Sequence, residues 1–478
     1  MEKKNLKVLF VASECAPVAK VGGLGDVVGS LPKALKEWGA DVRICLPKYQ
    51  IIDFGKHKFE LVAKDIIVKD EKVNVYQGFL PESEVILYLL ENERYFGQNG
   101  VYFEKSAFVG SFKEIQRFLF FSQAVLEVFP AIGWFPDIIH CHDWHTATVP
   151  ALLKLKTENL KLKTLLTIHN LANQGEWNAK DVLDFLNFRG DEIESLKIRD
   201  KEGNLNILRQ GILNADLINT VSENYAKEIL TKEYGEGLES SLLKKEKDLY
   251  GILNGIDENF FNPETDPYLK KNYSKENLKG KIENKIELQK ILNFKKDPKI
   301  PLFSFIGRLT SQKGIDLIIE IIPELVKMGC QLVILGVGEA DYEKKLLELF
   351  QKYPQDISVQ IKFDPLLAQK IYAGADIFLM PSKFEPCGLV QMIAMHYGAI
   401  PISRKTGGLA DTIEDEKTGF LFKEYNTKSF LEAINKTLKW YQEKKGWQKL
   451  IREAMKKDFS WQKSAKEYLK LYKILTLD

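Results

Sequence analysis

The sequence has few cysteines, and no two of them stand at the CxxC spacing of a metal or redox motif. It has five in all, an odd number, and they are far apart in the chain: Cys15, Cys45, Cys141, Cys330 and Cys387. This excludes the disulfide framework of a small secreted domain, because such domains carry several closely spaced pairs. We therefore expect reduced thiols and a cytoplasmic protein.

The sequence also lacks an excess of one charge and a long uninterrupted apolar run. Lys and Arg number 68 against 66 Asp and Glu, a net charge of +2, so we expect no nucleic-acid partner. The apolar stretch 118–135 is interrupted by Glu127 and Pro130 and falls short of the ~20 apolar residues that span a bilayer. The start of the chain resembles a weak signal peptide, but LKVLFVA is short and β-branched and is better explained as a strand. We expect no membrane segment.

Short β-rich runs alternate with helical patterns along both halves of the 478 residues. In the first half we expect helices over 26–39 and 113–129, and strands over 6–13, 41–47, 84–90, 136–142, 163–169 and 215–221. In the second half we expect helices over 317–329, 366–374 and 389–398, and strands over 301–307, 331–338, 358–363, 376–382 and 399–403. Continuous apolar strands alternating with helices indicate parallel sheets covered on both faces. The pattern therefore predicts an α/β protein with two doubly wound, Rossmann-like domains facing a central cleft.

The domain boundaries follow from where this pattern stops and restarts. We expect an N-terminal domain over 1–250 and a C-terminal domain over 251–455. The amphipathic segment in 456–478 would cap the second domain or cross back to the first. The lysine-rich stretch 269–299 is interpreted as a solvated helix beside the interdomain connection.

A glycine-rich loop, AKVGGLGDVVGSLP over 19–32, follows the first predicted strand. It is not a Walker A loop, because the lysine precedes the glycines, and its glycine spacing does not fit GxGxxG. Gly22 and Gly23 allow a close approach of the backbone to a ligand, and Lys20 adds a positive charge before a helix start. The loop is consistent with an anion site, although glycine turns after a first strand are common.

Four of the six histidines lie in HCHDWH and TIHN, at the ends of two predicted strands. No second group of ligands at metal spacing accompanies them, and the chain contains no Asp-x-Asp, so we expect no metal. The alternatives for His142, Asp143, Trp144 and His169 are polar groups lining a cleft or buried histidines with internal partners.

In the second half, three predicted strands are each followed by a loop with polar or small residues. Arg308 and Lys313 lie in SFIGRLTSQKGID and offer two cations to a diphosphate. Glu385 lies in SKFEPCGL, where it is either a partner of the helix dipole or an acceptor for sugar hydroxyls. Thr406, Gly407 and Gly408 follow the next strand, and such loops meet at one rim of a doubly wound sheet.

Taken together and in this order, the segments KVGGLGDVVGSLP, HCHDWHT, TIHN, ILNGID, GRLTSQKGID, PSKFEPCGL and RKTGGLADT resemble the bacterial glycogen synthases and plant starch synthases. The resemblance covers essentially the whole chain. It implies the GT-B fold and a retaining glucosyltransferase that moves glucose from ADP-glucose to the non-reducing 4-hydroxyl of an α-1,4-glucan, with no cofactor.

The resemblance also implies roles for individual residues. His169, Arg308, Lys313 and Glu385 would be catalytic: His169 near the donor glucose, the two cations on the diphosphate and Glu385 on the glucose hydroxyls. The remaining donor-binding residues would be Lys20, Gly22, Gly23, Asp143, Phe363, Cys387, Gly388, Leu389, Thr406, Gly407 and Gly408. The chain departs from the family at Phe363, where a tyrosine is common, at Lys383 and Val390, and over 97–111 on the acceptor side. These departures leave the base preference and the acceptor detail open.

The implied reaction develops negative charge on the departing diphosphate, which Lys20, Arg308 and Lys313 would stabilise without a metal. If Glu385 binds hydroxyls, front-face attack is favoured over a covalent glucosyl-enzyme, although both routes give retention. Two other functions stay open. One is a related GT-B transferase that uses UDP-glucose, and the other is a non-catalytic, two-lobed sugar-binding protein. The sequence does not indicate the oligomeric state.

Overall fold

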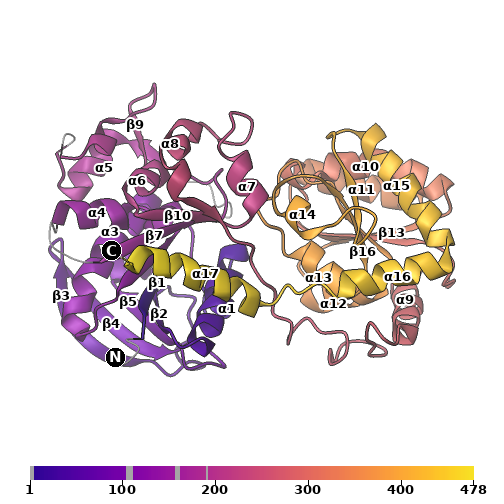
Figure 1. The fold of residues 1–478 in the computed structure, drawn as a ribbon, viewed down its shortest axis with the longest axis horizontal. Helices are drawn as coiled ribbons and strands as arrows, with labels where there is room; N and C mark the ends of the chain where they lie inside the picture. Colours follow the sequence, from indigo (N-terminus) through magenta and orange to yellow (C-terminus); the bar gives the residue numbers. More distant parts are fainter. Residues whose placement is uncertain (1–4, 99, 104–110, 157–161, 190–191, 478) are drawn as a thin grey trace. The chain divides into compact units, whose positions relative to one another are not determined.

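The computed structural model describes residues 5–98, 100–103, 111–156, 162–189 and 192–477, and it divides the chain into two compact units. Unit 1 consists of Met1–Gly255 together with Trp461–Asp478, and unit 2 consists of Ile256–Ser460. Each unit is built around its own mainly parallel sheet (Figure 1). The last helix thus belongs to unit 1, although the chain reaches it from unit 2.

The sheet of unit 1 has nine strands in the order β11-β10-β7-β6-β1-β2-β5-β4-β3. The strands are β1 Lys7–Val11, β2 Asp41–Pro47, β3 Glu60–Val68, β4 Glu71–Phe79, β5 Ile86–Glu91, β6 Ile138–His142, β7 Lys163–Ile168, β10 Leu217–Thr220 and β11 Leu249–Gly251. All neighbours pair in parallel except β3 with β4 and β4 with β5. The chain builds outward from β1 to one side and then returns to place β6 on its other side. The switch point of this sheet therefore lies between β1 and β6.

Both faces of this sheet are buried, as the apolar strands predicted. Leu9 and Val11 of β1 pack into one hydrophobic cluster, while Val8 and Phe10 pack into another on the opposite face. Successive side chains of a strand point to opposite faces, so a strand covered on both sides must be apolar throughout. The antiparallel β3–β4 hairpin was not predicted from the sequence, and it extends the sheet at the edge far from β6.

Helices and short elements complete unit 1. They are α1 Gly23–Glu37, α2 Glu93–Phe96, α3 Phe112–Ile132, α4 Thr148–Lys156, α5 Ala179–Leu186, α6 Ile207–Asn214, α7 Glu223–Glu228, α8 Glu239–Lys244 and α17 Trp461–Thr476, with the strand pair β8 Glu176–Asn178 and β9 Asn204–Asn206, and the 3₁₀ turns η1 Trp144–Thr146, η2 Glu194–Lys197 and η3 Glu246–Asp248. The helix α17 lies beside α1, as Figure 1 shows.

The helix α3 is long and apolar enough to cross a membrane by length and composition, but 67% of its apolar window is buried inside the structure. Its Phe118, Phe120 and Phe121 belong to the larger hydrophobic cluster of unit 1. Arg117 is also fully buried and donates to the backbone carbonyl of Tyr95. This helix is therefore part of the core of unit 1.

Unit 2 has a six-stranded parallel sheet in the order β14-β13-β12-β15-β16-β17. Its strands are β12 Leu302–Ile306, β13 Gln331–Gly336, β14 Ile357–Ile361, β15 Ile377–Met380, β16 Ile400–Arg404 and β17 Phe420–Phe422. Its helices are α9 Lys279–Ile291, α10 Ile315–Lys327, α11 Ala340–Lys352, α12 Pro365–Gly374, α13 Val390–His396, α14 Gly407–Thr412, α15 Thr427–Gln442 and α16 Lys444–Met455, with the 3₁₀ turn η4 Ser311–Lys313. The strand order reverses between β12 and β15, which is the switch point of this sheet.

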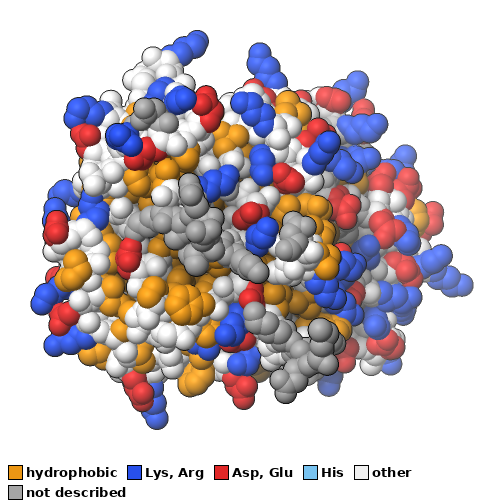
Figure 2. Space-filling view, turned by 60° about the vertical axis from the view of Figure 1, so that its left-hand side comes forward, with side chains coloured by type: hydrophobic (Ala, Val, Ile, Leu, Met, Phe, Trp, Pro, Cys, Tyr) orange, Lys and Arg blue, Asp and Glu red, His pale blue; other side chains and the backbone are white. Residues whose placement is uncertain are grey.

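One face of the molecule carries both charges side by side. In the view of Figure 2, Lys and Arg side chains alternate with Asp and Glu over the face that is shown, without an extended field of one sign. This pattern matches the near-zero net charge of +2. Any preference for an anionic ligand must therefore come from a local site.

Candidate active site

The glycine-rich loop of unit 1 follows β1 at the switch point and is closed by Glu14. The carboxylate of this buried residue accepts hydrogen bonds from the backbone N–H groups of Val21, at 2.7 Å, and Gly22, at 2.6 Å. The hydroxyl of Tyr102 donates to its other oxygen at 2.6 Å. Glu14 was not singled out from the sequence, and it is the residue that fixes this loop.

Lys20 and the two glycines predicted for donor binding lie on the open side of this loop. Lys20 Nζ is 2.6 Å from Asp26 Oδ1, and both side chains are partly exposed. A Cβ atom added at Gly23 would meet nothing within 4 Å, and one at Gly22 would make only ordinary contact with Glu14. Neither glycine has a positive φ. Packing and backbone conformation thus give no reason for glycine here, which agrees with space kept for a ligand.

The other side of the switch point carries Asp143 and His169, at the ends of β6 and β7. Asp143 has a φ of 54°, a left-handed conformation that is uncommon for a residue with a side chain. Its Oδ1 accepts the backbone N–H of His169 at 2.7 Å. Burial raises the pKa of Asp143 to about 7, so this carboxyl is partly protonated at neutral pH.

His169 and His142 form a pair of imidazoles. His142 Nδ1 lies 3.0 Å from His169 Nε2, and burial lowers the pKa of His142 well below the ordinary histidine value and that of His169 to about 3. Both rings are therefore neutral near pH 7. His142 is fully buried, whereas His169 keeps part of its side chain exposed at the strand end.

The histidine cluster does not form a metal site among the residues that the structure describes. No group of three or more His, Cys, Asp or Glu side chains within that part of the chain could hold an ion. His145 instead packs on Trp144 and Phe118, with ring centroids 4.3 Å and 4.6 Å away. Neutral histidines with aromatic and imidazole neighbours fill this part of unit 1.

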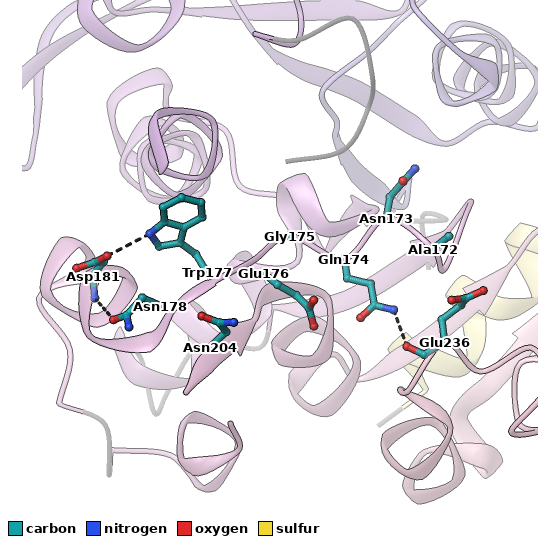
Figure 3. Close-up of a pocket in the computed structure, with 10 residues that line it drawn as sticks. All are labelled: Ala172, Asn173, Gln174, Gly175, Glu176, Trp177, Asn178, Asp181, Asn204 and Glu236. Atoms are coloured by element: carbon teal, nitrogen blue, oxygen red, sulfur yellow. Dashed lines mark hydrogen bonds between the residues drawn. The ribbon is translucent and has the colours of Figure 1, made fainter. Parts of the chain in front are cut away.

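A polar pocket of about 760 Å³ opens a few residues after His169 (Figure 3). It is lined by Ala172, Asn173, Gln174, Gly175, Glu176, Trp177, Asn178, Asp181, Asn204 and Glu236. In Figure 3, Trp177 Nε1 donates to Asp181 at 3.1 Å and Gln174 donates to the backbone oxygen of Glu236 at 2.9 Å. Among the described residues, the lining includes amides, carboxylates and an indole but no lysine or arginine. Such a lining disfavours a phosphate and suits a neutral ligand rich in hydroxyl groups.

In unit 2, Arg308 and Lys313 lie in the loop between β12 and α10. Arg308 is exposed, and its guanidinium donates to Gln312 Oε1 at 3.2 Å. Lys313 turns toward the end of β15, where its Nζ is 2.5 Å from Glu385 Oε2. Gly314 makes this approach possible, because a Cβ atom there would lie 2.1 Å from the Pro381 carbonyl oxygen.

Glu385, Cys387, Gly388 and Leu389 lie on the loop after β15, and the loop after β16 packs directly against them. Ser382 Oγ donates to Glu385 Oε2 at 3.2 Å, and Gly408 N donates to the Glu385 carbonyl oxygen at 3.0 Å. A Cβ atom at Gly407 would lie 1.9 Å from that oxygen, and one at Gly408 would lie 2.2 Å from the Cys387 oxygen. The glycines after the buried Thr406 are thus required for the two loops to meet.

Phe363, after β14, is 85% exposed, which is unusual for a large aromatic side chain. The loops after β12, β15 and β16 come from neighbouring strands, whereas β14 lies at the edge of this sheet. The structure therefore brings Lys313, Glu385 and Gly408 together at the switch point and places Phe363 at the outer side. Of the acceptor-side stretch 97–111, residues 99 and 104–110 lie outside the described residues.

Two protein families match the chain. Residues 7–244 match the starch synthase catalytic domain, and residues 284–456 match the glycosyl transferases group 1. The glycogen synthases of Thermotoga maritima and Desulforamulus reducens are each 43% identical to it, and the match covers 98% of this chain and 98% or 99% of theirs. This similarity spans both units.

Two solved structures share this fold, and one of them also supports the family match. The catalytic domain of starch synthase IV from Arabidopsis thaliana, bound to ADP and acarbose, is 35% identical with a TM-score of 0.88, and the match covers 99% of this chain and 100% of that one. A sucrose-phosphate synthase from Thermosynechococcus elongatus is 18% identical with a TM-score of 0.63, over 99% and 100% of the two chains. The second likeness concerns the fold alone.

Proposed function

Because the chain belongs to the glycogen synthase and starch synthase family of glycosyltransferases, with the GT-B fold, we propose that it transfers glucose from ADP-glucose to the non-reducing 4-hydroxyl of an α-1,4-glucan, with retention of the α configuration. The family and the enzyme class rest on the 43% identity over nearly the whole chain. The donor base, the acceptor and the stereochemistry are the parts that we propose.

The observation that carries the proposal is the pairing of Lys313 with Glu385 at the switch point of unit 2. Open α/β sheets bind ligands at this position, outside the carboxyl ends of the strands. Here it offers a cation for a diphosphate and a carboxylate for sugar hydroxyls, 2.5 Å apart and largely shielded from water. A nucleotide sugar needs both groups in one place.

The proposed leaving-group chemistry uses the positive charges of three side chains. As the glycosidic bond to the diphosphate breaks, negative charge grows on the phosphate oxygens, and we assign Lys20, Arg308 and Lys313 to stabilise it. Removing one such preorganised donor typically costs about 2.7–4 kcal/mol of transition-state stabilisation. None of these steps requires a metal ion.

For retention, we favour front-face attack over a covalent intermediate. Glu385 already accepts hydrogen bonds from Lys313 and Ser382, which suits a residue that orients hydroxyl groups. Asp143 has a pKa of about 7 and accepts the N–H of His169, so near neutral pH it is only partly available as an anionic nucleophile. Trapping a glucosyl ester on either carboxylate would contradict this assignment.

ADP is favoured as the leaving nucleotide because the starch synthase IV structure holds ADP. The exposed Phe363 offers an aromatic face for an adenine base, although it lacks the hydroxyl that a tyrosine would supply. A uracil base could stack there as well, so UDP-glucose is the alternative donor.

The acceptor glucan is assigned to the polar pocket of unit 1. The pocket begins close to His169 in the chain, and in the part of the chain that the structure describes it is lined by amides and carboxylates and by no cation. These groups hydrogen-bond to sugar hydroxyls, while the three carboxylates Glu176, Asp181 and Glu236 would repel a diphosphate.

Initial rates of glucan elongation with ADP-glucose and with UDP-glucose test the proposal. We expect ADP-glucose to be used at least tenfold more efficiently in kcat/KM. A preference for UDP-glucose would support the related transferase. Tight sugar binding without turnover of either donor would support the non-catalytic sugar-binding protein.

A further inference from the structure

Two tyrosines of α17 form hydrogen bonds inside the core of unit 1. Tyr468 and Tyr472 are four residues apart, so they lie on the same face of the helix, and both are completely buried. Tyr472 Oη lies 2.8 Å from His140 Nδ1, and Asn219 Nδ2 donates to Tyr468 Oη at 3.1 Å. The helix thus contacts the sheet through polar atoms as well as through apolar packing.

A path of buried hydrogen bonds joins these two contacts across three strands. His140 of β6 has its Nε2 2.6 Å from Thr167 Oγ1 of β7, and Thr167 Oγ1 donates to Asn219 Oδ1 of β10. All three side chains are fully buried. The path therefore leaves α17 at Tyr472, crosses β6, β7 and β10, and returns to α17 at Tyr468.

The directions of these bonds determine the tautomer of His140. Thr167 has one hydroxyl hydrogen and gives it to Asn219, so it must accept from an N–H on His140 Nε2. Burial lowers the pKa of His140 well below the ordinary histidine value, so the ring carries no second proton. Nδ1 is therefore an acceptor, and the Tyr472 hydroxyl donates to it.

The path reaches the candidate active site through His142. The rings of His140 and His142 lie on the same face of β6, with centroids 4.3 Å apart. His142 Nε2 is buried without a hydrogen-bond partner among the described residues, and His142 Nδ1 faces His169 Nε2 at 3.0 Å. His142 is thus held by its contact with His169 and by its neighbouring rings, His140 and Phe10. Its orientation depends on how His140 is fixed.

We propose that Tyr472, acting through His140, is a positioning residue for the transfer reaction. The Tyr472 hydroxyl of α17 donates to His140 Nδ1 and so fixes the His140 ring beside His142. His142 in turn sets the orientation of the His169 imidazole. The consequence for catalysis rests on the proposed function, because it assumes that His169 approaches the donor glucose. The structural consequence, a fixed His169 ring, does not depend on that assumption.

Tyr472→Phe tests the proposal because it removes one hydroxyl and keeps the ring. We expect kcat for glucan elongation to fall about threefold to tenfold, with KM for donor and glucan changed less than twofold. Thr167→Val should have the same effect and Thr167→Ser should restore activity, because serine keeps the hydroxyl. These threonine variants also test the path if Tyr472→Phe does not fold.

Ser464→Ala is the matched control. Ser464 lies on the same helix and donates to the Leu253 carbonyl oxygen at 2.6 Å, so the hydroxyl that this variant removes bonds to the backbone outside the path. We expect it to lower Tm without changing kcat. If Tyr472→Phe and Thr167→Val also lower Tm and keep the wild-type kcat, the path only stabilises the fold and the proposal is wrong.

Histidine side-chain ¹H–¹⁵N spectra supply a readout that needs no activity. Wild-type His140 should show the Nε2–H tautomer, and Tyr472→Phe should shift the ring nitrogens of both His140 and His169, whereas Ser464→Ala should shift neither. An unchanged His169 would overturn the proposal even if the enzyme were active. A shifted His169 in a protein that elongates no glucan would support the positioning path and contradict the proposed function instead.

Discussion

Lys313 Nζ lies 2.5 Å from Glu385 Oε2, and these two side chains come from loops on either side of the switch point in unit 2. The family resemblance gives them separate roles, one on the diphosphate and the other on the sugar. In the structure they are direct partners, and Ser382 donates to the same carboxylate oxygen. A change to either residue must therefore disturb the other.

Replacing Lys313 should impair both catalysis and stability. Lys313→Ala removes a cation from the diphosphate and leaves a buried carboxylate without its partner, so we expect kcat to fall by about tenfold or more and the free energy of unfolding to fall by roughly 3–5 kcal/mol. Arg308→Ala should reduce kcat similarly but leave Tm unchanged, because Arg308 is exposed. Steady-state kinetics and urea unfolding measure the two effects.

Lys327→Ala is the control for that pair, since Lys327 is an exposed lysine at the end of α10 that pairs with Glu324 one turn before it. This variant should leave kcat and the free energy of unfolding unchanged. If Lys313→Ala and Arg308→Ala keep wild-type kcat, the leaving-group role is wrong.

Gly23 should tolerate alanine in the fold but not in the reaction. The added Cβ would contact nothing within 4 Å, so Gly23→Ala should leave Tm within a degree or two, while the donor KM rises because the methyl group occupies the ligand side of the loop. Gly29→Ala is the opposite case, because its Cβ would lie 2.4 Å from the Ala16 carbonyl oxygen and should destabilise the fold. Equal donor KM values for wild type and Gly23→Ala would show that the loop is only a turn.

Phe363 should contribute to nucleotide affinity and little to stability. Stacking of a base on an aromatic ring is worth about 1–3 kcal/mol, so Phe363→Ala should weaken ADP binding by roughly fivefold or more. Phe79→Ala, which also removes an exposed phenyl ring (58% exposed), is the control in unit 1. Calorimetric ADP titration gives the comparison, and equal affinities for wild type and Phe363→Ala would remove the base-stacking role.

The polar pocket of unit 1 should affect the acceptor but not the donor. Asn173→Ala combined with Glu236→Ala removes two polar side chains from the lining, and we expect KM for glucan to rise about fivefold or more while KM for ADP-glucose stays within twofold. Glu194→Ala, at an exposed position of the 3₁₀ turn η2 and outside the lining, is the control. If KM for the donor rises and KM for glucan does not, the pocket has been assigned to the wrong substrate.

Acidification should destabilise unit 1 through its buried histidines. Burial lowers the pKa values of His140, His142, His145 and His169, so below about pH 6.5 the unfolded chain takes up protons that the folded chain does not. The stability of the fold therefore falls as the pH drops from about 6.5. Asp143, with its pKa raised to about 7, acts in the opposite direction, because its contribution to the free energy of unfolding is lost as pH rises from about 4 to 7. One carboxyl does not offset four histidines.

Urea unfolding at pH 7 and pH 5.5 tests whether the four histidines outweigh Asp143 in the free energy of unfolding. Each histidine contributes up to about 1.4 kcal/mol per pH unit. His145→Phe should reduce the pH dependence, because His145 packs among aromatic rings and burial lowers its pKa to about 3. Greater stability at pH 5.5 than at pH 7 would contradict the account.

Much of the fold follows from local pattern, because buried parallel strands must be apolar on both faces. The runs that became β1, β6, β12 and β15 were predicted for this reason, and the loops after them hold Lys20, Asp143, Lys313 and Glu385 among the candidate site residues. The β3–β4 hairpin was missed because it lies at a sheet edge, where several of its side chains are exposed and no continuous apolar run is needed. The predicted strands thus locate both switch points, but they leave out the β3–β4 edge of the sheet in unit 1.

Pairings between distant residues could not be predicted from motifs. Glu14 bonds to Gly22 across a loop whose shape the sequence does not encode locally. The lysine-rich stretch 269–299 was interpreted as a solvated helix, but Lys281 in it is buried and donates to the carbonyl oxygens of Ala373, Ala375 and Tyr397. The composition of the stretch predicted an exposed side chain for this lysine. In the structure it is buried, because three backbone carbonyl oxygens accept hydrogen bonds from its ammonium group.

Glucosyl transfer is tested by NMR observation of a maltooligosaccharide incubated with the protein and ADP-glucose labelled with ¹³C in its glucose. We expect labelled glucose in a new α-1,4 linkage at the non-reducing end, formed by the wild type and at least tenfold more slowly by Lys313→Ala. Release of free labelled glucose without elongation, or a β-linked product, would contradict this expectation.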